Sequence, residues 1–482
     1  ILKDIFPDIP VIIGGVEASM RRFTHYDYWK DELQQSMLLQ SGADLIVYGM
    51  GEKPITEIVR LLQKGVPFEK LNTIQQTGFI VKSKNDIPLN KNWETVHLAS
   101  HEECLQDKIS FARNFKVIEV ESNRINANRL VQQIGEEYLV VNPANAFLEE
   151  KEIDKIYDLP FTRMPHFKYN SKETIPAYEM IKFSVNIHRG CFGGCSFCTI
   201  SAHQGKFVSS RSEKSILDEV KKVSQLPDFK GSLSDLGGPS ANMYKMKGVD
   251  GSICARCNRP SCIYPKICFN LNTSHKPLLD LYDKVESLPE IKKLNIGSGI
   301  RYDLLMRERN TKGGDDIDSY LHRLITKNVS GRLKIAPEHT SDNVLKVMRK
   351  PSFELYDSFR KKFNSISEKA GLKQQIIPYF ISSHPGSKEE DMAQLAADTK
   401  AAGLQLEQVQ GFTPTPMTNA TVMYYTGINP YDLKPVYVAR TKNEKERQHM
   451  FFFWYKPEFK GRIKNTLEKL GRTDIIKNLL GK

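Results

Sequence analysis

The second half of the chain alternates short apolar segments with helical segments, and this alternation constrains the fold more than any other feature. Six segments have the composition of buried strands, and each of the first five is followed by a helix-type pattern. Strands that alternate with helices form a parallel sheet, because each helix returns the chain to the edge where the next strand starts. We therefore predict an α/β fold with a partial TIM-type (β/α)6 barrel over residues 181–420. The predicted strands are 182–188, 231–238, 292–299, 332–339, 374–382 and 404–412.

The helix after the first predicted strand has its own start signal and buried face. Ser210 and Glu213 have the spacing of a capping box. Ile216, Val220 and Val223 recur at helical spacing and form an apolar face. In barrels of this type, functional residues lie in the loops that follow the strands. We therefore expect the site in those loops.

The loop after the first predicted strand contains three of the chain's eight cysteines. Cys191, Cys195 and Cys198 form a C-x3-C-x2-C pattern with glycines between them. Four thiolates would complete a structural metal site, whereas three leave one position open, as catalytic sites require. The spacing therefore indicates a metal or iron–sulfur site with an open position. A zinc site completed by His188 or His203 is the alternative.

Four more cysteines lie between the second predicted strand and its helix, in an insertion over residues 250–275. Their C-x2-C-x4-C-x5-C spacing indicates a metal site. Sulfur ligands suit tetrahedral zinc and iron–sulfur clusters alike, so the pattern leaves both open. The candidate ligands are Cys254, Cys257, Cys262, Cys268 and His275.

The regions on either side of the predicted barrel have different patterns. Residues 1–72 contain two strand-like segments, PVIIGG and ADLIVYGMGE, and a helix near Pro54 with Ile55, Ile58, Val59 and Leu62 as its apolar face. We predict an incomplete α/β domain whose earlier strands lie upstream of residue 1. Residues 73–180 have weaker signals and are interpreted as a connecting region. Residues 421–482 are predicted to form a basic, helical C-terminal extension in which 451–455 pack against the barrel.

Charge and cysteine usage limit the class of protein. The chain has 69 Lys and Arg against 57 Asp and Glu, a net charge of +12 that would suit an anionic partner such as RNA. The positive charges are scattered, however, and form no long basic block. No signal-peptide profile is present, so we expect reduced thiols and a cytoplasmic location.

Longer strings around these motifs resemble a known family. C-x3-C-x2-C with Phe197 before the last cysteine is similar to the radical S-adenosylmethionine (SAM) signature. The run IHRGCFGGCSFCTISAHQG resembles the YgiQ family of radical SAM proteins, as do LGGPSANMY, GSGIRYDL, LKIAPEHTSDNVLKVM and FTPTPMTNATVMYYTG. The resemblance covers nearly the whole chain. It implies a radical SAM barrel preceded by an incomplete Rossmann-like domain of the cobalamin-binding type.

The resemblance also implies the cofactors and the chemistry. Cys191, Cys195 and Cys198 would hold a [4Fe-4S] cluster, and SAM would bind its open iron. One electron, from a donor of the flavodoxin or ferredoxin type, would release a 5′-deoxyadenosyl radical that abstracts hydrogen from an unknown substrate. The cobalt-ligating D-x-H-x-x-G loop is absent from these residues, so either that loop lies upstream of Ile1 or the domain does not bind cobalamin, and we favour the second.

Further cofactor-binding positions follow from the resemblance. Many relatives have an acidic residue where Pro239 stands, so that polar contact is lost here. Spacing alone would also fit an ordinary glycine turn or a surface ion pair at these positions. The alternatives to a general radical SAM enzyme are a methylthiotransferase-like RNA-modifying enzyme and a non-catalytic iron–sulfur or zinc protein. The candidate cofactor-binding residues are Phe197, Gly237, Gly238, Pro239, Ser298, Arg301 and Glu338.

Overall fold

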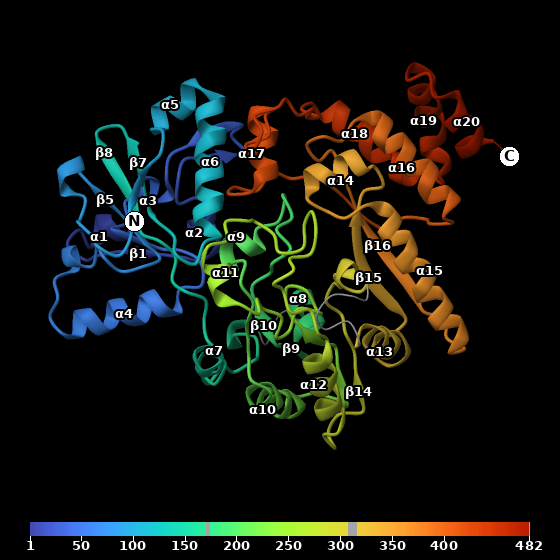
Figure 1. Cartoon of the computed structure of the whole chain (residues 1–482), viewed down its shortest axis with the longest axis horizontal. Helices are drawn as coiled ribbons and strands as arrows, with labels where there is room; N and C mark the ends of the chain where they lie inside the picture. The colour runs from blue at the N-terminus through green and yellow to red at the C-terminus, as the bar shows by residue number, and fades with distance from the viewer. Residues whose placement is uncertain (170–173, 307–315, 482) are drawn as a thin grey trace.

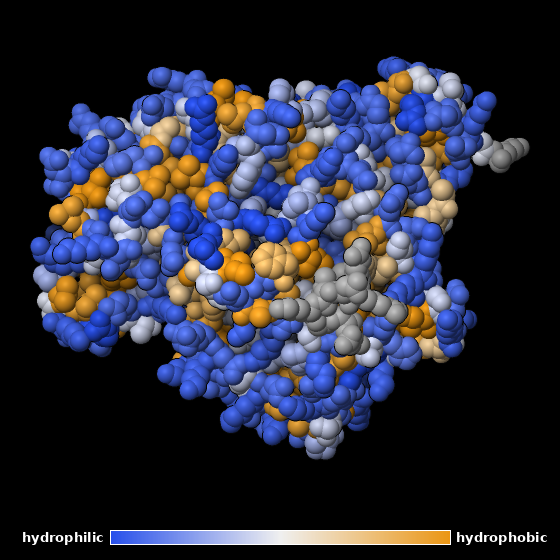
Figure 2. All heavy atoms as spheres, in the orientation of Figure 1, coloured by the Kyte–Doolittle hydropathy of each residue, from blue (hydrophilic) through white to orange (hydrophobic). Residues whose placement is uncertain are grey.

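The computed structural model describes residues 1–169, 174–306 and 316–481. An N-terminal α/β region lies at one end, the predicted barrel residues occupy the middle, and the C-terminal helices lie at the other end (Figure 1). Within the described residues, no helix is both long and apolar enough to cross a membrane. Hydrophilic residues cover most of the face in view, and apolar residues gather on it in small separate patches (Figure 2).

One six-stranded sheet organises the N-terminal region, in the order β1-β4-β5-β8-β7-β6. The β1–β4 and β6–β7 pairs are parallel, and the other neighbours are antiparallel. The predicted domain boundary at residue 72 falls inside this sheet, because β5 of the predicted connecting region pairs with β4 and three more strands of that region extend the sheet beyond β5. The strands are β1 (Ile12–Ile13), β4 (Leu45–Val47), β5 (Thr77–Val81), β6 (Thr95–His97), β7 (Arg129–Ile134) and β8 (Glu137–Val141), beside a separate hairpin of β2 (His25–Asp27) and β3 (Glu32–Gln34).

Both faces of the N-terminal sheet are buried, because alternate residues of a strand point to opposite sides. Ile46, Leu139 and Val141 pack in one apolar cluster. Val47 and Val140 pack in another, on the opposite face. The helices of this region are α1 (Leu2–Ile5), α2 (Gly15–Met20), α3 (Met37–Ser41), α4 (Glu52–Gln63), α5 (His101–Gln106), α6 (Lys108–Ser122), α7 (Glu150–Tyr157) and α8 (Pro176–Ile181).

Parallel strands occupy all six predicted strand segments of the middle region. β9 pairs with β13, β12 with β14, β15 with β16, and β16 with β17, each in parallel. A parallel bridge between Ile300 and Ile335 joins the third segment to the fourth. The strands are β9 (Ser184–Asn186), β10 (His188–Arg189), β11 (Ser209–Ser210), β12 (Ser232–Leu233), β13 (Asp235–Gly237), β14 (Lys293–Leu294), β15 (Arg332–Glu338), β16 (Gln375–Ser382) and β17 (Gln408–Gly411).

Helices follow these strands and supply much of the core. Ile216, Val220 and Val223 of the first long helix are buried against Val185 and Leu236 of the strands, as their spacing predicts. That helix begins at Glu213 rather than near Ser210, because Ser210 belongs to strand β11 and pairs there with His188 of β10. The helices are α9 (Ile200–Gln204), α10 (Glu213–Ser224), α11 (Gly251–Ala255), α12 (Lys276–Glu286), α13 (Ile317–Arg323), α14 (Asp342–Met348), α15 (Phe353–Lys369) and α16 (Glu389–Ala401).

The C-terminal helices after the first pack with one another, on α16 and on the last two strands, whereas the first packs on α6 and β2. Phe451 and Phe452 are fully buried with Met392 and Leu395 of α16, which agrees with the predicted packing role. Figure 1 shows the last three of these helices at the far end of the molecule from the N-terminal sheet, and the first beside α6. They are α17 (Asn419–Thr426), α18 (Lys442–Met450), α19 (Pro457–Lys469) and α20 (Thr473–Leu480).

Candidate metal and cofactor site

The three-cysteine loop lies between β10 and β11, which pair antiparallel just beyond the end of β9. Distant segments hold its backbone. The Ser196 N–H donates to the carbonyl of Met348 at 3.0 Å, and the Ser196 carbonyl accepts from the Ala420 N–H at 2.8 Å. The loop is therefore fixed between the end of α14 and the start of α17.

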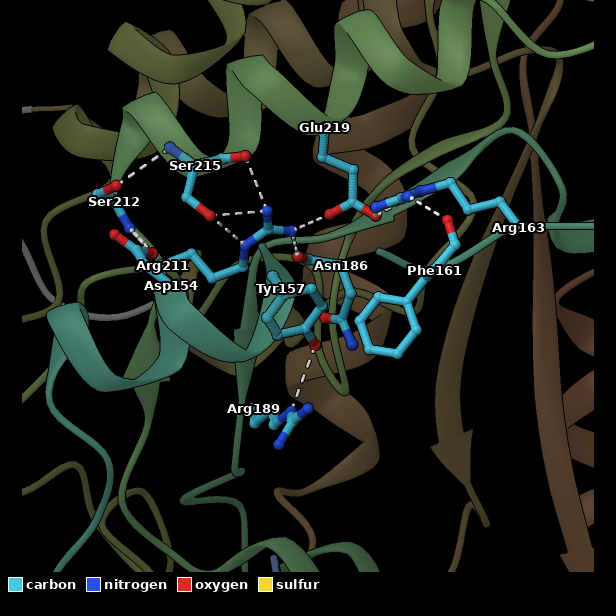
Figure 3. Close-up of polar contacts among 10 residues, drawn as sticks. All are labelled: Asp154, Tyr157, Phe161, Arg163, Asn186, Arg189, Arg211, Ser212, Ser215 and Glu219. Carbon is cyan, nitrogen blue, oxygen red and sulfur yellow. Dashed lines mark hydrogen bonds and ion pairs between the residues drawn. The ribbon is translucent and has the colours of Figure 1, made fainter. Parts of the chain in front are cut away.

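The β10–β11 hairpin is also anchored at its base by arginines that stack on Tyr157 of α7 (Figure 3). The Arg211 guanidinium lies 4.1 Å from the Tyr157 ring centroid, and Arg189 Nε donates to the Tyr157 hydroxyl at 3.3 Å. Arg211 is fully buried, pairs with Glu219 of α10 and donates to the Asn186 carbonyl at 2.8 Å. These contacts fix the strands that carry the cysteines.

Two glycines allow the loop to turn as tightly as it does. Gly190 has φ +85°, and a Cβ there would lie 2.2 Å from the Phe207 carbonyl oxygen. Gly194 has φ +61°, and a Cβ there would lie 2.4 Å from the Pro260 carbonyl oxygen. Because other residues strain at such φ values and would collide here, Gly190 before the first cysteine and Gly194 before the second are structurally required.

One buried arginine faces the cysteine loop from the turn after the third strand. Arg301 Nη1 lies 3.4 Å from Cys195 Sγ, and its Nη2 pairs with Asp303 at 2.5 Å. Asn242 holds the backbone of Arg301 with two hydrogen bonds, of 2.8 Å to its N–H and 3.1 Å to its carbonyl. A Cβ on Gly193 would lie 2.7 Å from Arg301 Nη1, so this glycine makes room for the cation.

Burial favours the protonated form of two of the loop thiols in the metal-free chain. It raises the pKa of Cys198 to about 12 and also raises the pKa of Cys191, where the Arg301 charge acts in the opposite direction. Among residues 1–169, 174–306 and 316–481, no three His, Cys, Asp or Glu side chains are already arranged around a metal position. The fit to a cluster therefore depends on three thiols in one glycine-rich cradle with a cation facing them, and metal binding would displace their protons.

The glycine segment after the second strand lies against the turn after the third. A Cβ on Gly237 would lie 2.7 Å from Ser298 Oγ, and one on Gly238 would lie 2.7 Å from His188 Nε2. His188 is buried, and its Nε2 lies 2.9 Å from the Ser240 carbonyl oxygen. The structure therefore brings Gly237, Gly238 and Ser298 together, and the half-buried Pro239 follows them.

Asp235 organises the same turn, although the sequence alone did not single it out. Its carboxylate accepts from the N–H groups of Gly297 at 2.8 Å and Ser298 at 3.1 Å, and from the Ser298 hydroxyl. Asn242 and Asp303 stand in strings that resembled the family and Asp235 directly precedes one, but only their contacts show that they position Ser298 and Arg301.

Glu338 ends β15 in a strained and buried conformation. Its φ is +73°, its side chain pairs with Lys350 at 3.7 Å, and the residue is 7% exposed. Burial raises the pKa of Glu338, partly opposed by Lys350 and Arg301. A non-glycine residue at positive φ is costly and often marks a functional site.

Phe197 lies in the same loop but packs away from the thiols, toward the core. Its ring centroid is 5.8 Å from that of His384, edge to face, and it packs against the cluster that contains Met348 and Phe412. Ser196 Oγ lies 3.2 Å from His384 Nε2. Phe197 therefore anchors the loop in this structure.

The second cysteine group lies directly beside the first loop. The Cys262 N–H donates to the Phe192 carbonyl at 3.0 Å, and Cys191 and Cys262 border one apolar cluster. Lys206 is 1% exposed, with its Nζ 3.8 Å from Cys257 Sγ and 2.8 Å from the Arg259 carbonyl oxygen. Lys206 was not among the residues predicted from the sequence, although it directly follows the run IHRGCFGGCSFCTISAHQG.

The other thiols of this group also have polar or apolar neighbours. Asn270 Nδ2 lies 3.4 Å from Cys254 Sγ, burial raises the pKa of Cys262 to about 11, and Cys268 packs against the shared apolar cluster. His275 starts α12, stacks 4.5 Å from the Tyr320 ring, and lies 3.3 Å from Asn242 Nδ2. These contacts place His275 behind Arg301.

Two family models and a solved structure are similar to parts of the chain. A family model described as Radical SAM N-terminal matches residues 1–184, and one described as Domain of unknown function (DUF3362) matches residues 407–480. The structure of the radical S-adenosylmethionine methyltransferase TsrM from Kitasatospora setae, solved with cobalamin and a [4Fe-4S] cluster bound, aligns with a TM-score of 0.43 and 13% identity. That alignment covers 86% of this chain and 59% of TsrM.

Similar sequences cover the chain from end to end. A UPF0313 protein of Bacteroides thetaiotaomicron is 56% identical over 100% of this chain and 79% of its own length. A UPF0313 protein of Porphyromonas gingivalis is 57% identical over 99% of this chain and 75% of its own length. The archaeal UPF0313 protein of Methanocella arvoryzae is 43% identical over 98% of this chain and 77% of its own length. The chain therefore belongs to the UPF0313 family, which is the YgiQ family of radical SAM proteins.

Proposed function

We propose that this chain is a radical SAM enzyme that carries a [4Fe-4S] cluster on Cys191, Cys195 and Cys198 and binds SAM at the open iron. When bound, these groups supply a reductively generated 5′-deoxyadenosyl radical for hydrogen abstraction from the substrate. The observation that carries the proposal is the three-thiol loop beyond the first parallel strand, with Arg301 3.4 Å from Cys195 Sγ.

The proposed roles of the chain's own residues follow from their contacts. Arg301, held by Asp303 and Asn242, places a fixed positive charge beside the sulfurs and an anionic cofactor group. The segment Gly237 to Pro239 and Ser298 form a wall in which backbone can approach the cofactor closely. Glu338, at the end of the fourth strand, supplies a buried carboxyl group on another side.

We extend the proposal to the finer architecture. The six parallel strand segments are interpreted as an open (β/α)6 barrel with the cysteine loop at its mouth. The N-terminal sheet is interpreted as a relative of cobalamin-binding domains that does not hold cobalamin. An electron donor of the flavodoxin or ferredoxin type is required by the chemistry, and a cytoplasmic location would keep the eight free thiols reduced.

A second metal at Cys254, Cys257, Cys262 and Cys268 is part of the proposal, as structural zinc or as an auxiliary iron–sulfur cluster. Their shared surroundings support it, because Lys206 and the apolar cluster at Phe192 connect this group to the first loop. Metal analysis of a chain with Cys191, Cys195 and Cys198 all changed to Ala tests it. Zinc or iron retained by that variant supports a second site, and an empty variant contradicts it.

The central experiment is anaerobic reconstitution with iron and sulfide, followed by incubation with SAM and dithionite. We expect 5′-deoxyadenosine from the wild-type chain and none from Cys191→Ala. Absence of product from protein that carries both cluster and SAM would favour the non-catalytic alternative, or an enzyme that cleaves SAM only with its substrate present.

A surface groove supports RNA modification as the second candidate function. The groove, of about 790 Å³, runs from the ends of β16 and β17 to the β2–β3 hairpin. Trp29 is 84% exposed on its edge, Lys445 Nζ lies 2.8 Å from the Tyr424 hydroxyl, and Arg440 lies 5.2 Å from the Tyr424 ring centroid. Trp29 is therefore an exposed ring near two cations, although Tyr424 itself is only 4% exposed, and an exposed ring beside cations suits base stacking in single-stranded nucleic acid binding.

Salt-dependent RNA binding tests this candidate. We expect the wild-type chain to bind a labelled single-stranded RNA at low salt, with affinity that falls as salt rises. Trp29→Ala should weaken binding without changing cluster content. No binding at low salt would remove the RNA candidate and leave the general radical SAM proposal intact.

A further inference from the structure

A cavity of about 110 Å³ lies between the N-terminal sheet and the residues that follow the cysteine loop. On one side it is walled by Arg22 and by the turn from β4 to α4, which includes Gly49 and Lys53. On the other side it is walled by residues 201–207, in and after α9, and by Arg189. Neither the radical chemistry nor the second cysteine group uses this cavity.

The wall of the cavity is strongly positive. Arg22, Lys53, Arg124, Arg189 and Lys206 line it, and no Asp or Glu of the described chain does. Such one-sided charge in an enclosed space favours an anion, because the surrounding protein screens charge less than water does.

Arg22 is the cation whose charge is least compensated. It is 2% exposed, and its guanidinium donates to the Ser19 carbonyl at 2.6 Å and the Ser122 hydroxyl at 3.2 Å, beside the Tyr48 ring at 4.5 Å. In the described part of the chain no carboxylate pairs with it, and its buried Nε has no hydrogen-bond partner. A buried charge without a counter-ion is costly, so an anion in the cavity would stabilise the fold.

Three of the other four cations differ from Arg22, because acidic residues outside the cavity already pair with them, and the fourth, Lys206, donates to the Arg259 carbonyl beside Cys257. Lys53 pairs with Glu152 at 2.9 Å and Arg124 with Glu121 at 2.8 Å. Figure 3 shows Arg189 where it contacts Tyr157, and its other side pairs with Glu52 at 2.6 Å. These residues make the electrostatic potential in the cavity positive, whereas Arg22 also has an Nε–H group without a hydrogen-bond partner among the described residues.

The turn from β4 to α4 adds a second feature that favours an anion. α4 is twelve residues long, begins at Glu52 after the N-cap Gly51, and has no side-chain cap. Its first N–H groups are therefore available, and the helix dipole favours negative charge there. The turn lies at the carboxyl end of the parallel β1–β4 pair, which is the usual ligand-binding edge of such sheets.

We propose that this cavity binds a phosphate group, held by Arg22 and by the N-terminus of α4. The phosphate is either free inorganic phosphate or the ester of a small metabolite, since both present the same charged oxygens. The size of the cavity suits a compact anion, and one wall residue, Phe147, is 45% exposed, so an attached group could extend to the surface there.

The occupied cavity would also stabilise the cysteine loop. The wall residue Gln204 accepts from the Gly190 N–H at 3.0 Å through Oε1, and the Gly205 carbonyl accepts from the Cys191 N–H at 3.1 Å. Across the cavity, Gly49 packs on α9, since a Cβ there would lie 3.2 Å from the His203 carbonyl oxygen. A bound phosphate would therefore stabilise the backbone at Cys191 through these wall residues.

The test measures binding to the full metal-free chain, so that it does not depend on the radical chemistry. Isothermal titration and thermal unfolding are run with inorganic phosphate and with ribose 5-phosphate, against chloride at equal ionic strength. We expect saturable binding and a raised unfolding temperature with at least one phosphate probe. Stronger binding of ribose 5-phosphate identifies an ester site, and equal or stronger binding of inorganic phosphate identifies a free-phosphate site. If neither probe exceeds chloride, the proposal is wrong.

A matched pair of variants assigns the binding to this cavity. Ser122→Asp places a carboxylate beside Arg22, and Ser122→Asn has the same shape without the charge. We expect Ser122→Asp to weaken phosphate binding at least about tenfold and Ser122→Asn to retain most of it. Arg22→Gln should also weaken binding about tenfold, while Arg60→Gln, on the exposed side of α4, should not. Equal binding by both Ser122 variants would overturn the assignment, even if Arg22→Gln does not fold.

Discussion

The two cysteine groups are in contact, yet the cation beside each of them is held by a different kind of partner. At the first group, Arg301 faces Cys195 and is held by a carboxylate and by Asn242. At the second group, Lys206 faces Cys257 and is held by a neutral carbonyl. The first group also opens onto Gly237, Ser298 and Glu338, whereas the second has a fourth thiol of its own. Under the proposed function, this difference fits an exchangeable ligand at the first group and four protein ligands at the second.

The largest expected effect comes from removing one thiol from each group. Cys191→Ala should lose the reconstituted [4Fe-4S] cluster and all 5′-deoxyadenosine formation, because two thiols cannot hold the cluster. Cys257→Ala should keep the first cluster and lose the second metal. Iron, sulfide and zinc content, with a product assay, measure both. If Cys257→Ala also lost all iron from the first loop, the two groups would be one site.

The next largest effect concerns the two cations. Arg301→Gln leaves the buried Asp303 unpaired, so we expect it to lower the free energy of unfolding by about 3–5 kcal/mol. Lys206→Gln leaves only a carbonyl unpaired and should cost about 1–3 kcal/mol. Urea unfolding of the metal-free chains measures both. Equal losses would show that the carboxylate at the first group does not set the difference.

These contrasts show what the sequence could and could not predict. Spacing alone located both cysteine groups and the strands beside them, because those features are local. Asp235, Asn242 and Lys206 were missed because their role depends on segments brought together by the fold: Asn242 holds Arg301 from 59 positions away in the chain. The helix start at Ser210 was predicted wrongly, since its pairing with His188 overrides the local capping signal. The N-terminal sheet was divided at residue 72 because its strands are short and mostly pair with partners far along the chain.

The apolar face predicted for α4 shows the same limit. Ile58 is buried as expected, but Ile55, Val59 and Leu62 are each more than 40% exposed. Helical spacing predicted which residues share a face. It did not predict how much of that face the sheet would cover, because coverage depends on the neighbouring elements and not on α4 itself.

A smaller effect is the pH dependence of stability. It has the same sign at both cysteine groups, because it comes from burial of the thiols and not from the neighbouring cations. Burial raises the pKa of Cys198 to about 12 and that of Cys262 to about 11 in the metal-free chain. The stability from each protonated thiol is complete below the unfolded pKa, about 8.5, and is lost as pH rises toward the folded pKa. Above the unfolded pKa, each thiol should therefore lower the free energy of unfolding by up to about 1.4 kcal/mol per pH unit.

Single serine variants measure the contribution of each thiol. The free energy of unfolding of the metal-free wild type should fall between pH 8 and 10. Cys198→Ser and Cys262→Ser should each make that fall smaller. Metal-loaded protein should show no such fall, because its thiols are already deprotonated. A flat profile for the metal-free wild type would mean that the thiols are solvated, and the comparison would then depend on the cations alone.

The smallest expected effect compares one serine at each group. Ser298 donates to Asp235 beside the first group, and Ser261 Oγ accepts from the N–H groups of Ile263 at 3.1 Å and Tyr264 at 2.9 Å beside the second. Each change to Ala removes hydrogen bonds worth about 1 kcal/mol, so both variants should lose similar stability. Only Ser298→Ala should also weaken SAM binding to the reconstituted protein, because only the first group has a ligand to exchange. Equal SAM affinity in both variants would place the cofactor away from the turn after the third strand, and the open side of the first group would then have to be sought at Glu338.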